Sequence, residues 1–268
     1  MRRALAPTGI ATAVLALGTG CWLTASFDGI TAPEPLPQEP DGAAEAAAPD
    51  GGCEGTLLCD DFEHGGAFDL TIWPRPEADQ VRATIAIDRA RARSGEHSLH
   101  VRVPPSPDGG RAEGFLIHKR DAPLPSTFHG RVFVFVPTER PAEPWRPELL
   151  GFQDKDGKGF GLSFAQGLTL NAFVYSETPR VSVNGTAPVP AERWACVTWV
   201  VEGAGTPTSR LEVSVDGAPI LEARSQVGFP SFVELYLGLR LETPSPTVAS
   251  DVWFDDLAVA EAPIPCAS

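Results

Sequence analysis

The sequence is poor in basic residues, which excludes one large class of partner. Lysine and arginine together number 21 against 35 aspartates and glutamates, so the formal net charge is -14. No basic cluster occurs beyond Arg2 and Arg3 at the start of the chain. Because nucleic-acid phosphates are bound by clustered lysine and arginine side chains, we expect no nucleic-acid partner.

Long apolar runs are scarce as well. The uncharged run over residues 4–17 is too short to span a bilayer. It follows Arg2 and Arg3 and precedes Gly18-Thr19-Gly20, which is the order of basic, apolar and small residues in an export signal. We therefore predict that residues 1–20 are a signal peptide.

Cys21 follows these small residues directly, as in a bacterial lipoprotein signal, where such a cysteine becomes the acylated first residue. Gly18 stands three residues before it, where leucine is expected. We predict an exported protein whose only membrane contact is the lipidated Cys21, anchored to the outer membrane or the cell surface. A periplasmic or secreted protein with another cleavage point is the alternative.

Cysteine is rare, with 5 in the chain. If Cys21 carries lipid, the other four are an even number, which in an exported protein suggests two disulfides. Four cysteines allow three pairings, and the spacing selects none of them. Cys59 with Cys266 and Cys53 with Cys59 are two alternatives, and Cys196 as a buried free thiol is a third.

Residues 21–52 are rich in alanine, proline, glutamate, aspartate and glycine, a composition that cannot bury a core. We predict a disordered linker there, which would tether the domain that follows. Residues 53–268 have the length of a single all-β domain, and we expect it to be a monomer.

Helical periodicity is nearly absent from this domain, whereas short apolar runs broken by glycine and proline are frequent. Asp154–Gly159 and Val215–Ala218 are typical of hairpin turns. Two acidic, aromatic segments, Leu58–Glu63 and Asp251–Val259, are expected to pair as the first and last strands of a two-sheet antiparallel sandwich. The runs in which we predict strands are 84–87, 98–103, 114–119, 130–136, 149–153, 159–164, 168–175, 194–201, 211–215, 233–239 and 252–259.

Several segments in order carry a family resemblance: Cys-Asp-Asp-Phe-Glu at 59–63, Arg-Ser-Gly-Glu-His-Ser-Leu-His-Val at 93–101, Arg-Trp-Ala-Cys-Val-Thr-Trp at 193–199, Val-Ser-Val-Asp-Gly at 213–217 and Phe-Asp-Asp-Leu at 254–257. Over residues 56–260 the chain resembles the concanavalin A-like jelly rolls, particularly laminin-G-like and polysaccharide-lyase-like domains. This resemblance implies an antiparallel jelly roll. The architecture hosts lectins, hydrolases, lyases and adhesive modules, so it does not select an activity.

The resemblance also implies a structural calcium ion where the first strand, an early turn and the last strand meet. Asp61, Glu63, the Gly95 carbonyl and Asp256 would supply the oxygen ligands. In an extended strand Asp61 and Glu63 share one face, and Phe254 shares a face with Asp256. The alternative is that these acids are solvated charges at the sheet edge.

Lyases of this fold use an arginine-rich strand with a glutamate, a Gln-x-His strand and a tyrosine. Here Glu113 follows a single arginine, Gln153 has no histidine two places on, and Tyr175 alone fits, with His118 the remaining titratable group. An enzyme would need His118, Tyr175 and Glu113 or an arginine to converge in one cleft. The sequence has no zinc spacing, phosphate loop, nucleophile elbow or paired glycosidase carboxylates.

These departures favour a non-catalytic domain that binds carbohydrate or another cell-surface ligand, such as a protein. A polysaccharide lyase or glycoside hydrolase is the alternative, and an envelope scaffold without a small ligand is the third. Alternation along the strands predicts one polar and aromatic face on a concave sheet, although solvated sheet faces alternate in the same way. The ligand-binding residues expected there are Gln153, Asn171, Phe173, Tyr175, Tyr236 and Arg240.

Overall fold

The computed structural model describes residues 53, 55–74, 80–142, 146–174, 181–225, 227–245 and 247–266, all within one compact unit. The predicted signal peptide, Cys21, the linker and Tyr175 lie outside the described residues. In the part of the chain that is described, no helix combines the length and the apolar character needed to cross a bilayer.

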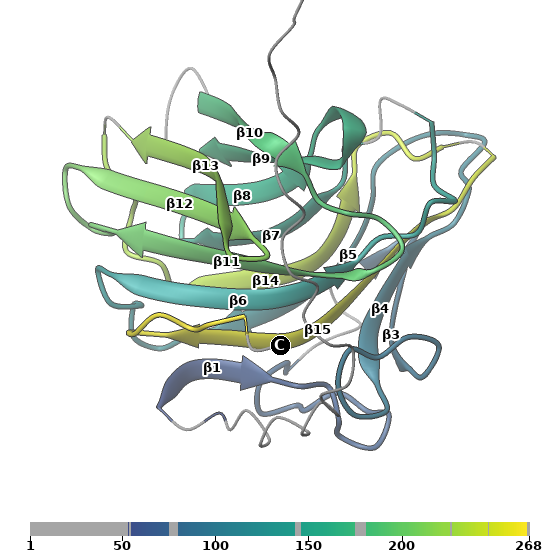
Figure 1. Cartoon of the computed structure of the whole chain (residues 1–268), viewed down its shortest axis with the longest axis horizontal. Helices are drawn as coiled ribbons and strands as arrows, with labels where there is room; N and C mark the ends of the chain where they lie inside the picture. The colour runs from purple at the N-terminus through teal and green to yellow at the C-terminus, as the bar shows by residue number, and fades with distance from the viewer. Residues whose placement is uncertain are drawn as a thin grey trace, which may run out of the picture. The chain divides into compact units, whose positions relative to one another are not determined.

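The domain is a sandwich of two antiparallel sheets, seen one behind the other in Figure 1. The eight-stranded sheet contains β13 (Ala218–Ser225), β12 (Ser209–Val215), β11 (Trp194–Glu202), β6 (Phe128–Phe135), β15 (Ser250–Ala260), β4 (Ser98–Val103) and β3 (Thr84–Asp88) in that order, with β1 (Thr56–Asp60) beside β15. The seven-stranded sheet contains β10 (Val181–Pro188), β9 (Thr169–Val174), β8 (Gly159–Phe164), β7 (Glu148–Gln153), β14 (Glu234–Leu241), β5 (Ala112–Lys119) and β2 (Gln80–Val81). One short 3-10 turn, η1 (Gln166–Leu168), precedes β9.

The predicted fold class is confirmed, and so is the pairing of the first strand with the last. β1 runs antiparallel to β15, with Cys59 opposite Ala258 and Asp60 opposite Leu257. Each predicted strand is present, with its bounds unchanged or shifted by a few residues. The two predicted turns join β7 to β8 and β12 to β13, and Asp216 and Gly217 both have positive φ, as a tight hairpin requires.

Three strands were not predicted from the sequence: β2, β10 and β13. β10 and β13 end the two sheets, and β13 shows the sequence Ala-Pro-Ile-Leu-Glu-Ala-Arg-Ser, with a proline near its start. Proline is tolerated near the beginning of an edge strand, because one side of the ladder is unpaired there. Their apolar content is too low to mark them as strands without the neighbour against which they pair.

The core between the sheets is strongly aromatic. Phe128, Phe152, Phe160 and Phe232 are fully buried and form a cluster with ring centroids 5.1–6.0 Å apart. Such edge-on and tilted pairs add to the free energy gained from burial. They hold the two sheets together and leave the other face of each sheet free to carry function.

β15 changes partner halfway along its length. One side pairs with β6 from Trp253 to Ala260, while the other side pairs with β4 up to Phe254 and with β1 from Leu257 onward. The register shifts between Asp255 and Ala258, and Asp256 has a φ of +48°. This bulge brings the end of β1, the start of β4 and two carboxylates of β15 to one point.

Candidate functional site

A polar groove lies on the face of the seven-stranded sheet that is turned away from the core. It encloses about 270 Å³. Its lining residues come from β10, β9, β8, β7 and β14 and from the segments that flank β7 and β14: Arg146, Glu148, Ser163, Asn171, Phe173, Ser182, Arg240 and Glu242. Neighbouring strands lie about 4.8 Å apart, so the groove presents polar groups at regular steps across the sheet.

Glycines on β7 and β8 allow large side chains to lie flat on the groove floor. A Cβ atom on Gly151 would come within 2.0 Å of the Tyr236 hydroxyl oxygen, and one on Gly161 within 2.5 Å of the Phe173 ring. The two rings are accordingly covered, with only 4% of Tyr236 and 6% of Phe173 exposed. The rings therefore build the floor instead of standing up as open shelves.

A charged network runs through this floor. Tyr236 donates a hydrogen bond of 2.6 Å to Glu148 Oε1, and Arg240 donates one of 3.0 Å to Glu148 Oε2. Arg240 also binds Glu113 at 2.7 Å, and Arg111 shares that carboxylate. Burial tends to raise the pKa of Glu113, but the hydrogen bonds from the two arginines hold it below its ordinary value.

Five of the six residues expected to bind ligand lie on this one sheet face. Asn171 donates to Ser182 at 2.8 Å and to Asn184 at 2.9 Å, and Gln153 donates to Glu234 at 2.7 Å. The pairing of β14 places Tyr236 opposite Gly151 and Glu234 opposite Gln153, so their side chains share the groove face. Tyr175, the sixth, lies outside the described residues.

His118 lies on the opposite face of the sheet from Glu113. Its Nδ1 is 2.9 Å from the Ile72 carbonyl oxygen, and its ring meets the fully buried Trp73 edge-on with the centroids 6.2 Å apart. His118 lies five positions after Glu113 on β5, and an odd separation in a strand puts two side chains on opposite faces. The convergence that an enzyme using His118 and Glu113 would need is therefore not formed.

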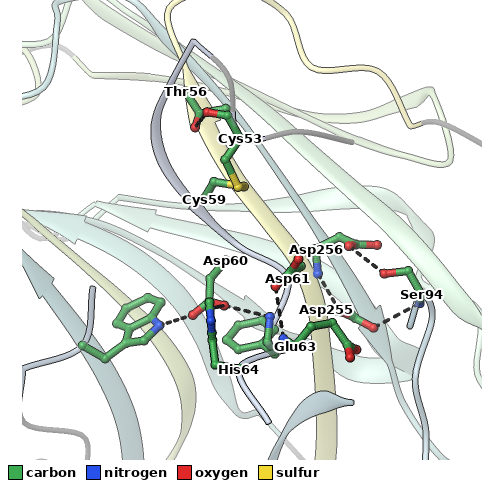
Figure 2. Close-up of a disulfide and its surroundings, with 12 residues drawn as sticks. Cys53, Thr56, Cys59, Asp60, Asp61, Glu63, His64, Ser94, Asp255 and Asp256 are labelled. Atoms are coloured by element: carbon green, nitrogen blue, oxygen red, sulfur yellow. Dashed lines mark hydrogen bonds and ion pairs between the residues drawn. A yellow bond between two sulfur atoms is a disulfide. The ribbon is translucent and has the colours of Figure 1, made fainter. Parts of the chain in front are cut away.

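Asp60 anchors the segment that follows β1, as Figure 2 shows. It is 2% exposed, and its carboxylate accepts the Trp73 indole N–H at 2.5 Å and the Phe62 amide N–H at 2.7 Å. Burial raises its pKa, while these donors and the nearby His64 act in the opposite direction. β1 ends at Asp60 and Phe62 has a φ of +58°, so the alternation expected through Glu63 does not apply.

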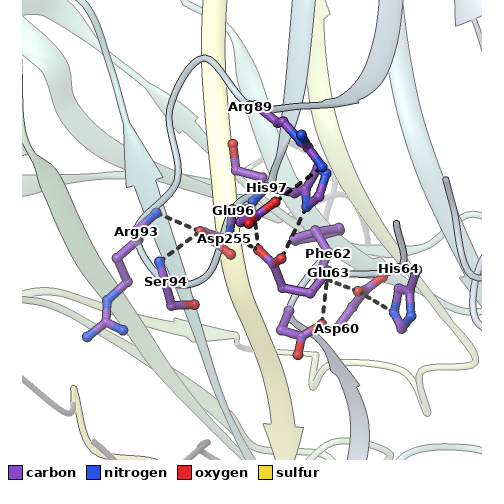
Figure 3. Close-up of polar contacts among 12 residues, drawn as sticks. Asp60, Phe62, Glu63, His64, Arg89, Arg93, Ser94, Glu96, His97 and Asp255 are labelled. Atoms are coloured by element: carbon purple, nitrogen blue, oxygen red, sulfur yellow. Dashed lines mark hydrogen bonds and ion pairs between the residues drawn. The ribbon is translucent and has the colours of Figure 1, made fainter. Parts of the chain in front are cut away.

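Glu63 reaches across to the turn that precedes β4, as Figure 3 shows. Its Oε1 accepts the backbone N–H groups of Glu96 at 2.9 Å and His97 at 2.7 Å, and its Oε2 lies 3.1 Å from His97 Nδ1. Gly95 passes beneath the carboxylate with a φ of +58°. A Cβ atom there would lie 2.4 Å from the Glu63 carboxyl carbon, so only glycine fits this approach.

The two carboxylates of the β15 bulge hold the same turn. Asp255 accepts the backbone N–H of Arg93 at 2.8 Å, while Asp256 accepts the Ser94 hydroxyl at 2.9 Å and the Arg93 guanidinium at 3.0 Å. Burial and the adjacent charge of Asp256 raise the pKa of Asp255 to about 8, against the lowering effect of the backbone donors.

Of the residues expected to bind calcium, Glu63 and Asp256 both hold the turn that contains Gly95, but their oxygens fit a calcium ion poorly. Ca²⁺ takes six to eight oxygen ligands. Both oxygens of Glu63 accept N–H donors, and the Arg93 guanidinium already supplies a positive charge beside Asp256. Asp61 lies instead in a cluster with Asp60 and His64, whose ligand atoms lie within 4.8 Å of one another. That set contains a nitrogen ligand, which calcium does not prefer.

The two disulfides join Cys53 to Cys59 and Cys196 to Cys266. The first closes a short loop at β1 (Figure 2), and the second ties the segment after β15 to β11. Cys59 and Cys266 are therefore not partners, and Cys196 is not a free thiol.

No protein-family model matches the sequence, and no curated protein matches it. Solved structures do resemble the fold. An endo-beta-1,4-glucuronan lyase from the fungus Trichoderma reesei is 16% identical with a TM-score of 0.60, covering 77% of this chain and 96% of that one. The cellulose induced protein Cip1 is 18% identical with a TM-score of 0.59, covering 78% and 100%. A PL-14 alginate lyase from Aplysia kurodai is 9% identical with a TM-score of 0.51, covering 71% and 93%. The domain therefore has the jelly-roll fold of these carbohydrate-related proteins.

Proposed function

We propose that the domain binds a polysaccharide in the groove of the seven-stranded sheet without cleaving it. The observation that carries this proposal is the unbroken polar lining across five neighbouring strands, from Ser182 on β10 to Arg240 on β14. Amide, hydroxyl, carboxylate and guanidinium groups are the partners that sugar hydroxyls require. The carbohydrate-related structures that share this fold give the proposal further support.

Recognition in this groove rests on hydrogen bonds more than on ring stacking. Phe173 and Tyr236 are almost fully covered, whereas Arg146 and Glu242 are exposed at the groove walls. A ligand strand crossing the sheet would meet Asn171 and Ser163 on the floor and these two charges at the sides. The mixture of charges suits a neutral or weakly acidic sugar chain.

A polysaccharide lyase is the second candidate, because Tyr236 and Glu148 form an adjacent proton-donor and proton-acceptor pair at 2.6 Å with Arg240 beside them. Elimination needs a base, an acid and a positive charge near the sugar carboxylate. Glu148, however, accepts hydrogen bonds on both of its oxygens, which restricts its use as a base. We therefore rank binding ahead of cleavage.

The test is to measure binding of glucuronan, alginate and a neutral glucan to the protein by affinity electrophoresis, and to assay the mixtures for unsaturated products. We expect at least one polysaccharide to retard the protein, without product. Asn171→Ala should weaken this binding about tenfold, because it removes the side-chain amide and the hydrogen bonds that this amide forms in the groove. Arg224→Met on β13 of the other sheet is the control and should bind as the wild type does.

Product formation would favour the lyase. If the Tyr236→Phe variant then forms no product, Tyr236 would be assigned as the base or acid of that reaction. If none of the three polysaccharides is retarded, the binding proposal fails and the envelope scaffold becomes the better reading. A decrease in Arg224→Met equal to that in Asn171→Ala would show that the groove is not the site.

We infer that the protein is exported and anchored through a lipidated Cys21. The support is the export pattern over residues 1–20 and the two disulfides, which form in oxidising compartments. Incorporation of labelled palmitate, with its loss in Cys21→Ser, is the measurement. Label retained in Cys21→Ser would contradict the anchor.

A further inference from the structure

A second cleft lies on the outer face of the eight-stranded sheet, on the opposite side of the sandwich from the groove. It encloses about 450 Å³. β4 and β15 form its floor, and four segments form its walls: the turn before β4, the segment after β4, the segment after β6 and the segment before β15. Its lining residues are Arg91, His100, Arg102, Pro105, Pro137, Glu139, Thr247, Val248, Ala249, Asp251 and Trp253. We call it the outer cleft.

The floor of the outer cleft is held rigidly. The His100 ring stacks on the Trp253 indole with the centroids 4.2 Å apart and the planes 2° from parallel. Its Nδ1 lies 2.9 Å from an Asp88 carboxylate oxygen and its Nε2 lies 2.8 Å from Asp251. Asp251 is also paired with Arg102 at 3.1 Å. The charge of Asp251 is therefore already balanced within the floor.

Arg91 has a different environment, because no carboxylate among the described residues forms an ion pair with it. Its guanidinium lies 4.2 Å above the Phe135 ring centroid and 5.0 Å from that of Trp253, so the aromatic rings orient it. Hydrogen bonds from Thr138 lower the pKa of Glu192, and the charge of Arg91 lowers it further. The Glu192 carboxylate is thus engaged by Thr138.

The turn that carries Arg91 is fixed in place before any ligand arrives. The Arg91 carbonyl accepts the Ser98 hydroxyl, and Asp255 and Asp256 hold the next residues, Arg93 and Ser94. A second donor also lacks a partner here, since the buried Nε1 of Trp253 has no hydrogen bond in the described part of the domain. Arg91 is therefore held at the cleft by its turn and by the rings of Phe135 and Trp253.

We propose that the outer cleft binds a sugar acid, with the Arg91 guanidinium holding its carboxylate. A guanidinium binds a carboxylate through two parallel hydrogen bonds. Asp251 and Glu139 line the same cleft, which disfavours a dianion such as a phosphate monoester. The apolar surfaces of Pro105, Pro137 and Val248 suit the carbon face of a sugar ring, and the volume accommodates one or two rings. This inference is independent of the groove, because the two sites lie on different sheets.

The experiment is a calorimetric titration of the full chain with D-glucuronate and, separately, with D-glucose. We expect glucuronate to bind and glucose not to bind. Arg91→Gln should weaken glucuronate binding at least about tenfold. Arg91→Lys should weaken it less, because lysine keeps the positive charge but lacks the two parallel N–H donors of the guanidinium. Arg224→Gln, on β13 and outside both sites, is the matched control and should leave glucuronate binding unchanged.

Val248→Trp tests the site without removing any charge, since the larger side chain would fill the outer cleft and should also abolish binding. Circular dichroism at the titration temperature checks that each variant is folded. Three results would overturn the proposal: no glucuronate binding by the wild type, equal binding by Arg91→Gln and wild type, or a loss in Arg224→Gln as large as that in Arg91→Gln. The polysaccharide measurement on Asn171→Ala reports separately on the groove, so failure of either site is distinguishable.

Discussion

Gly95 lies directly beneath the Glu63 carboxylate, with a φ of +58°. Gly95→Ala should lower the free energy of unfolding by about 3 kcal/mol, because it strains the backbone and displaces the hydrogen bonds of Glu63. Gly157→Ala is the control: its φ is +75°, but nothing lies within 4 Å of the added Cβ atom. We expect it to cost about 1 kcal/mol. If urea denaturation shows the same loss of free energy of unfolding in Gly95→Ala and Gly157→Ala, the contact with Glu63 contributes nothing to stability.

Asp255 should make the domain less stable as the pH rises. Its pKa is raised from 3.8 to about 8 by burial and by Asp256. Between these values the folded state binds the proton more than the unfolded state does, so the free energy of unfolding falls with increasing pH. In Asp255→Asn this contribution disappears. The free energy of unfolding of the variant, relative to that of the wild type, should therefore increase by up to about 1.4 kcal/mol for each unit that the pH rises.

Urea denaturation of both proteins between about pH 5 and pH 7 measures this gain. Asp156→Asn, in the exposed turn between β7 and β8, is the control and should keep the wild-type slope. If Asp255→Asn loses stability relative to the wild type as the pH rises, Asp255 is ionised in the folded state and the backbone donors outweigh burial.

At the level of elements, the two disulfides should contribute unequally. Cys196 and Cys266 are 70 residues apart, whereas Cys53 and Cys59 are 6 apart. A longer loop loses more entropy on closure in the unfolded chain. Replacing both members of the long pair by alanine should cost about 4 kcal/mol, and replacing both members of the short pair about 2 kcal/mol. Thermal denaturation ranks the two double variants, and the reverse order would contradict the loop argument.

The junction of β1, β4 and β15 should keep its stability without metal. Arg93 and backbone N–H groups satisfy the carboxylates that were expected to bind calcium. We therefore expect the same Tm with excess EDTA as with added calcium. A rise in Tm with calcium that is lost in Asp256→Asn would restore the calcium site, because a ligand bound only by the folded state raises its stability.

For the whole domain we expect one cooperative unfolding transition, since the described residues form a single compact unit around one aromatic core. Tryptophan fluorescence reports on the core through Trp199, and far-ultraviolet circular dichroism reports on both sheets. The two melting curves should coincide. Separate midpoints would show that the two sheets, and with them the groove and the outer cleft, unfold independently.

Much of the groove could be predicted from the sequence, because strand alternation alone places Asn171 with Phe173 and Tyr236 with Arg240. Alternation failed where the backbone leaves the extended conformation. At Phe62 and Asp256 the φ is positive, so the expected faces of Glu63 and Asp256 could not be read from the spacing. The groove floor was also missed: a strand glycine such as Gly151 gives no sign of which ring will lie over it.

The sequence by itself determined the sandwich, its hairpins and the pairing of its first and last strands, because periodicity, turn residues and apolar runs are local properties. Only the tertiary structure decided which cysteines pair, which face His118 takes, and that Arg93 forms an ion pair with Asp256. Those outcomes depend on contacts between residues as far apart as Arg93 and Asp256, whose distance is set by the packing of β4 beside β15.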